Sequence, residues 1–164
     1  MQTLVRPGTS ARSLLDETEL AAVVATVVRD NANLNEAFAA RIVEEALKFV
    51  ATCAAQPEGG LRPSRAVDMG WHALILHTHT YARLCDKLGR FVHHWPDSPA
   101  LARVPLDALR QRKALHRTQA LMVGAGYEPD PTLWMQMANG VGDCSTSECE
   151  GGPAPCCGTC GPKK

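Results

Sequence analysis

The sequence predicts an all-α protein: a small bundle-like domain of four to five helices, followed by a disordered, cysteine-rich C-terminal tail. Apolar residues recur at intervals of three and four along several stretches, and glycine- and proline-rich segments separate these stretches. No segment demands a β-strand. Hydrophobic residues make up 45% of the 164 residues and charged residues 21%, which is typical of one globular domain. We expect a flexible N-terminus over residues 1–13, a helical domain over 14–137 and the tail over 138–164.

The first two helices are predicted by their apolar stripes. Residues 16–29 form the first, and an asparagine-rich stretch then interrupts the pattern. Asn33 and Glu36 have the spacing of a capping box, which predicts the start of the second helix. The stripe of the second helix repeats every three or four residues, at Leu34, Phe38, Ile42, Ala46, Phe49 and Cys53.

Beyond a Gly/Pro-containing loop over residues 56–63, Ser64 is the expected cap of a third helix that runs to about Lys87. Gly89 is its expected end, and residues 90–99 form an irregular connection. The core face of this helix is predicted at Val67, Trp71, Leu74, Thr78, Ala82 and Cys85. A fourth helix over residues 106–123 and a short turn from Asp130 through Met137 complete the domain.

The third predicted helix is rich in histidine. Asp68, His72 and His79 fall within about 40° of one another on a helical wheel, whereas His77 points elsewhere. Asp68 and His72 are four residues apart, so their side chains can meet.

The loop that follows this helix adds His93 and His94. A site made of Asp68, His72 and one of this pair has suitable ligands for zinc or another borderline divalent ion. The alternative is structural, with Asp68 simply orienting the ring of His72 by a hydrogen bond.

Five of the seven cysteines crowd the last 21 residues: Cys144, Cys149, Cys156, Cys157 and Cys160. In a reducing compartment such a cluster indicates metal binding, redox chemistry or modification more than structural disulfides. Thiolates suit zinc or copper(I), and the surrounding glycines allow them to converge. The other two, Cys53 and Cys85, lie in helical patterns where a cysteine is usually a small buried hydrophobe.

Charge and motifs exclude several classes of protein. Lys plus Arg and Asp plus Glu both number 17, so no global field favours nucleic acid or an anionic membrane. The longest apolar run is far shorter than the roughly 20 residues of a membrane span, and the N-terminus has no signal-peptide pattern. We therefore expect a cytoplasmic protein. Phosphate-binding, dinucleotide-binding and serine-hydrolase motifs are absent from the sequence, so no catalytic residue is predicted.

The stretch from Trp71 to Tyr81, the segment from His93 to Pro96, the Leu133-Trp134 pair and the tail from Cys144 together resemble the glycine-rich domain-containing protein-like family. The likeness is greatest to short bacterial members of the actinomycete type and covers most of the chain from about residue 40. It implies a shared helical fold and draws attention to the same histidines and cysteines. It implies no activity.

Metal binding without catalysis is the leading functional prediction, with zinc or copper held by the tail cysteines and by the Asp/His group. A second hypothesis is a precursor whose folded domain presents the tail to a peptide-modifying enzyme. A third is a helical module that binds another protein, with structural histidines.

Overall fold

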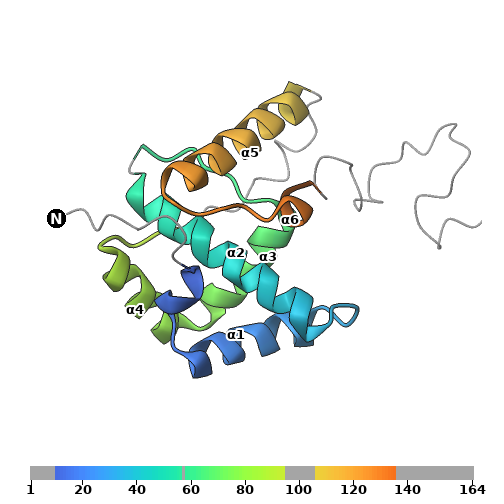
Figure 1. Cartoon of the computed structure of the whole chain (residues 1–164), viewed down its shortest axis with the longest axis vertical. Helices are drawn as coiled ribbons and strands as arrows, with labels where there is room; N and C mark the ends of the chain where they lie inside the picture. The colour runs from blue at the N-terminus through green and yellow to red at the C-terminus, as the bar shows by residue number, and fades with distance from the viewer. Residues whose placement is uncertain (1–9, 57, 95–105, 136–164) are drawn as a thin grey trace, which may run out of the picture.

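A computed structural model describes residues 10–56, 58–94 and 106–135 of the chain, and this part is entirely helical (Figure 1). A short 3₁₀ helix precedes six α-helices, and no strand occurs in these three ranges. The elements are η1 (Ala11–Leu14), α1 (Glu17–Asp30), α2 (Glu36–Ala55), α3 (Arg65–Leu76), α4 (Thr78–Leu88), α5 (Leu106–Gly124) and α6 (Pro131–Met135). The predicted all-α class is confirmed. Helical structure begins before residue 14, because Ala11 of η1 is buried against the core.

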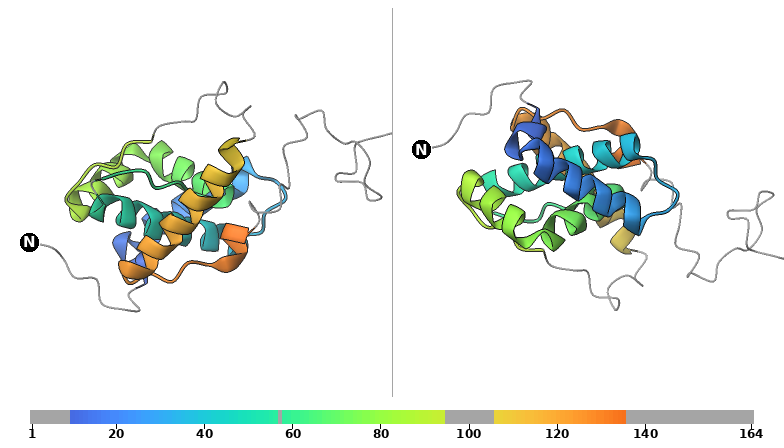
Figure 2. Two further views of the ribbon diagram at one scale, coloured as in Figure 1. Left: turned by 90° about the horizontal axis from the view of Figure 1, so that it is seen from above. Right: turned by 90° about the horizontal axis from the view of Figure 1, so that it is seen from below.

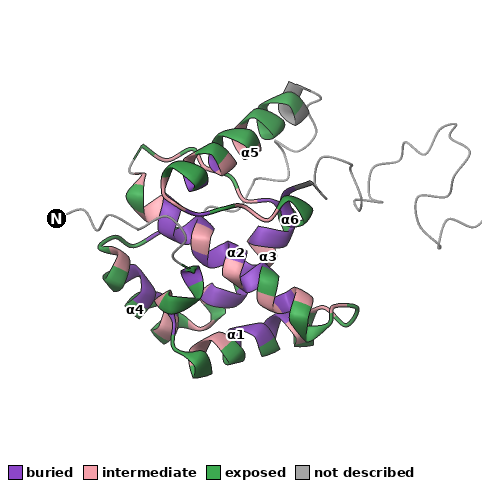
Figure 3. Cartoon of the chain, in the orientation of Figure 1, coloured by how far each residue is buried: buried purple, intermediate pink, exposed green. Residues whose placement is uncertain are grey.

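The long helix α2 lies at the centre of the molecule. It contacts η1, α1, α3, α4 and α5, and the views from above and below place α5 and α1 on opposite sides of it (Figure 2). Ten of its twenty residues are therefore buried, and Figure 3 shows buried stretches along α2. The largest fully buried side chains of α2 are Ile42, Leu47 and Phe49.

Close approach of α2 and α3 depends on Gly70. A Cβ atom at this position would lie 2.8 Å from the carbonyl oxygen of Ile42 and 3.0 Å from the Cβ of Ala46. Such contacts are closer than van der Waals packing allows, so only glycine lets the two helices pack at this distance. Asp68 and His72, two residues to either side of Gly70, are thereby held by a helix docked directly on the core.

One of the two predicted helix caps is confirmed: Ser64 caps α3 by accepting a hydrogen bond from the amide of Val67. At the start of α1 the structure adds a capping box of Asp16 and Glu19, which was not predicted. The predicted box of Asn33 and Glu36 is wrong. Asn35 is the N-cap of α2, and its side chain accepts from the amide of Phe38. All three asparagines in this stretch suit a cap, so composition alone did not select the right one.

The predicted third helix is two helices, which meet at His77. This residue leaves the helical region with φ −86° and ψ 65°, and its Nε2 lies 2.8 Å from Oγ1 of Thr26 on α1. The break rotates the following turns, so Thr78 and Ala82 are exposed and the predicted core face is wrong there. Tyr81 and Leu84 are buried together with Cys85 in α4. Gly89, with φ 75°, ends α4 as predicted.

Within the described residues, the C-terminal half of the fold agrees closely with the prediction. α5 ends one residue beyond the predicted Val123, and its Arg110, Lys113 and Arg117 are exposed. None of the helices within residues 10–56, 58–94 and 106–135 is long and apolar enough to cross a membrane. The tail over residues 138–164, and Met137 before it, lie outside the described residues.

Candidate metal centre

The side chains of Asp68, His72 and His94 converge at the surface of α3, and we refer to them as the Asp68 cluster. Nε2 of His94 lies 3.0 Å from Oδ1 of Asp68 and 3.0 Å from Nε2 of His72. Nε2 of His72 lies 3.5 Å from Oδ2 of Asp68. One potential ligand atom from each residue is thus within 4.8 Å of the others.

Helical spacing brings the first two members together, because residues four apart in α3 are neighbours on one face. This face borders the buried one, so the Asp68 side chain is 37% exposed and that of His72 57% exposed. His94 reaches them from the segment that follows α4, and its side chain is only 18% exposed. Its ring packs against Trp71, with ring centroids 4.5 Å apart.

A buried chain of hydrogen bonds holds the segment that carries His94. Nε1 of Trp71 donates to the hydroxyl of Tyr81 over 2.9 Å, and this hydroxyl donates to the carbonyl oxygen of Val92 over 2.6 Å. Burial raises the pKa of Tyr81, so its hydroxyl keeps the proton that it donates. The backbone two residues before His94 is thereby fixed to both α3 and α4.

These distances suit a four-coordinate divalent ion. Zinc–nitrogen bonds of about 2.0–2.1 Å at tetrahedral angles place two ligand atoms about 3.3 Å apart. Within the Asp68 cluster the three separations are 3.0, 3.0 and 3.5 Å. Two imidazoles and one carboxylate occupy three positions and leave the fourth open, as in many zinc enzymes.

Hydrogen bonds pair the three groups of this cluster less completely than a metal ion would. A hydrogen on Nε2 of His94 can donate to Asp68 or to Nε2 of His72, which face it at the same distance. A divalent ion would contact all three groups at once, because one ligand atom from each lies within 4.8 Å of the others.

His93, a predicted ligand, and His79, predicted to lie near Asp68 on the helical wheel, are not part of this group. His93 is exposed and its ring packs on Phe91, and His79 is exposed on α4, beyond the break at His77. The prediction of His79 beside Asp68 assumed one continuous helix and is wrong for that reason.

All five tail cysteines, Cys144, Cys149, Cys156, Cys157 and Cys160, lie outside the described residues. Of the two earlier cysteines, Cys85 is buried as predicted and Cys53 is partly buried. Burial raises the pKa of Cys53 to about 12, although Arg90 acts in the opposite direction. Its thiol is therefore protonated at neutral pH and is a poor metal ligand there.

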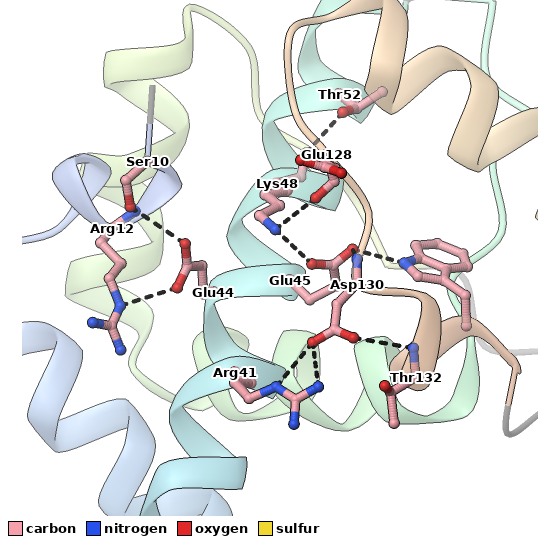
Figure 4. Close-up of polar contacts among 11 residues, drawn as sticks. Ser10, Arg12, Arg41, Glu44, Glu45, Lys48, Thr52, Glu128, Asp130 and Thr132 are labelled. Atoms are coloured by element: carbon pink, nitrogen blue, oxygen red, sulfur yellow. Dashed lines mark hydrogen bonds and ion pairs between the residues drawn. The ribbon is translucent and has the colours of Figure 1, made fainter. Parts of the chain in front are cut away.

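A second polar cluster surrounds the buried side chain of Glu45, and sequence reasoning did not find it (Figure 4). Oε1 accepts from Nε1 of Trp134 over 2.7 Å and from the amide of Asp130 over 3.0 Å, while Oε2 accepts from Nζ of Lys48 over 2.9 Å. We call Glu45, Lys48, Asp130 and Trp134 the Glu45 cluster. A glutamate between Ile42 and Phe49, within an apolar stripe, was the available signal.

The chain belongs to the UCP032817-like family, which matches it over residues 11–120. The matched range includes the whole Asp68 cluster and ends before α6 and the tail cysteines. No curated protein and no solved structure matches the chain. The likeness to the glycine-rich domain-containing protein-like family stays a prediction from sequence.

Proposed function

We propose that this member of the UCP032817-like family binds a divalent first-row metal ion, zinc in the first instance, through Asp68, His72 and His94. The observation that supports the proposal most is the convergence of three ligand atoms at separations suited to one ion. Imidazole and carboxylate ligands also suit copper(II) and iron(II), so the same measurements should include these ions.

Preorganisation is a further argument. Trp71 and Tyr81 join the helix of the α3 ligands to the His94 segment through buried hydrogen bonds and a ring contact, so binding an ion requires little further ordering of the chain. Groups that orient metal ligands in this way typically raise affinity about 10–100-fold. A pair of exposed histidines without such buried supporting residues would lack this preorganisation.

The test separates the Asp68 cluster from the tail. Zinc binding is measured by calorimetry on the full-length chain in which Cys144, Cys149, Cys156, Cys157 and Cys160 are all replaced by serine. We expect one zinc per chain. His72→Ala and His94→Ala should each weaken binding by more than about 100-fold, since each removes a ligand rather than a supporting group.

Matched controls are available for both histidines. His79→Ala removes an exposed histidine one helix further along, and His93→Ala removes the exposed neighbour of His94; neither should change zinc affinity. Equal zinc binding by His94→Ala and His93→Ala would contradict the proposal and leave the cluster with a structural role only. Comparison with the chain that keeps its cysteines then shows whether the tail adds further zinc or copper(I), as the sequence predicts.

A further inference from the structure

A surface pocket of about 230 Å³ lies beside His94. Its lining combines Ile75 and Thr78, around the junction of α3 and α4, and Tyr81 of α4 with Phe91, Val92 and His93 of the segment after α4. His94 itself forms part of the wall. The ring that contributes a nitrogen to the Asp68 cluster is therefore also a boundary of this pocket.

The pocket lies next to the candidate metal ligands along α3. Ile75 follows His72 by three residues, which places the two side chains next to each other on the same face of the helix. Asp68, His72 and Ile75 thus form one stripe, with the ligands at one end and the pocket at the other. A molecule in the pocket would extend from the neighbourhood of the metal centre.

Charge and size indicate the class of this molecule. A divalent ion with one carboxylate and two neutral imidazoles keeps a net charge of +1, so its fourth position favours an anionic oxygen. The adjoining walls are largely apolar. A cavity of about 150 Å³ holds benzene in a well-studied protein, so 230 Å³ is enough for a body of that size.

We propose, on the basis of the metal-binding function above, that the pocket binds a small molecule with an anionic oxygen head and an apolar body the size of one ring. The head occupies the open position of the metal, and the body lies against Ile75, Phe91 and Val92.

Two hydroxamates test this inference, because both carry the same metal-binding head. Acetohydroxamate has only a methyl group as its body, whereas benzohydroxamate carries a ring. Zinc-loaded protein with serine in place of the five tail cysteines should bind benzohydroxamate at least about tenfold more tightly than acetohydroxamate, since burial of a ring typically contributes that much.

Thr78→Trp blocks the pocket from an exposed position on its rim and should abolish this preference without weakening zinc binding. His79→Trp, its exposed neighbour outside the pocket, is the matched control and should retain it. A Thr78→Trp chain that keeps its zinc and still prefers benzohydroxamate to the same extent would overturn the assignment of the pocket.

Methyl NMR provides a measurement that needs no substitution. The chain has two isoleucines, Ile75 in the pocket and Ile42 of α2, which is buried in a cluster with Ala66 of α3 and Leu133 of α6. Benzohydroxamate should shift the Ile75 signal by ring-current effects and leave Ile42 unchanged; acetohydroxamate should shift neither comparably. Equal affinity for the two hydroxamates, or no selective shift at Ile75, would overturn the inference while zinc binding stands. Failure to bind zinc, detected before any hydroxamate is added, would overturn both proposals.

Discussion

The Asp68 cluster and the Glu45 cluster are both built around a carboxylate, yet they have opposite surroundings. Glu45 is 1% exposed and accepts hydrogen bonds from two N–H groups and an ammonium group. Asp68 is partly exposed and faces two imidazole nitrogens that also face each other. Both oxygens of Glu45 already accept from donors that the fold supplies, and burial keeps them from a ligand in solvent. The contrast teaches that burial among hydrogen-bond donors distinguishes a structural polar cluster from a candidate metal site.

The largest expected effect concerns the structural cluster. Glu45→Ala would leave the indole N–H of Trp134 without its buried acceptor and would remove the carboxylate partner of Lys48, whose ammonium keeps its hydrogen bond to the carbonyl oxygen of Glu128. Breaking a buried charge pair in this way typically costs about 3–5 kcal/mol, which denaturant unfolding would measure. Glu44→Ala, which removes a surface ion pair with Arg12 and an exposed hydrogen bond from the hydroxyl of Ser10, should cost less than about 1 kcal/mol. Similar losses of folding free energy from the two substitutions would contradict a structural role for the Glu45 cluster that differs from that of a surface ion pair.

An intermediate effect is expected at Tyr81, whose hydroxyl supports the segment of His94. Tyr81→Phe should lower zinc affinity about tenfold, because the ligand loses its orienting backbone contact. It should also cost about 1–2 kcal/mol of folding free energy for the lost buried hydrogen bonds.

The other tyrosine of the chain supplies the control for this prediction. Tyr127 is buried and follows α5, outside the Asp68 cluster. Tyr127→Phe should leave zinc affinity at the wild-type value at a temperature where all three proteins are folded. A loss of affinity in both variants would indicate a general effect of stability rather than positioning by Tyr81.

The smallest effect is a pH dependence within the Glu45 cluster. Burial raises the pKa of Asp130, but hydrogen bonds from Arg41 and Thr132 outweigh it and hold this pKa below its usual value of 3.8. Ionised Asp130 therefore stabilises the fold above pH 3.8, and this contribution is lost as the pH falls through the lowered pKa.

Asp130→Asn keeps an oxygen that can accept from the amide of Thr132 but removes the charge opposite Arg41. It should lower stability at pH 7 by less than about 1 kcal/mol, and the difference from wild type should shrink below about pH 4. Thermal unfolding at several pH values measures it, with Asp86→Asn on the exposed side of α4 as the control. A difference that persisted unchanged at pH 2 would contradict a role for the charge.

Much of the fold was predictable because helices are specified by neighbours in sequence. The stripe of α2, the cap at Ser64 and the end of α4 at Gly89 each depend on residues within one or two turns. The spacing of Asp68 and His72 is local in the same sense, so two of the three residues of the candidate centre followed from it. Local patterns also misplaced the cap of α2, because several adjacent asparagines satisfy the same rule.

Sequence by itself determined the helical class, most helix boundaries and the pairing of Asp68 with His72, since these depend on the 3.6-residue period. Tertiary structure decided the rest. His77 breaks the helix where it meets Thr26 of α1, 51 positions earlier. The hydroxyl of Tyr81 holds the carbonyl of Val92, 11 positions later, and His94 rather than His93 lies in the cluster. Glu45 accepts a hydrogen bond from Trp134, which lies 89 positions later in the chain. Contacts of this range form only when the core has brought distant segments together, and no local periodicity encodes them.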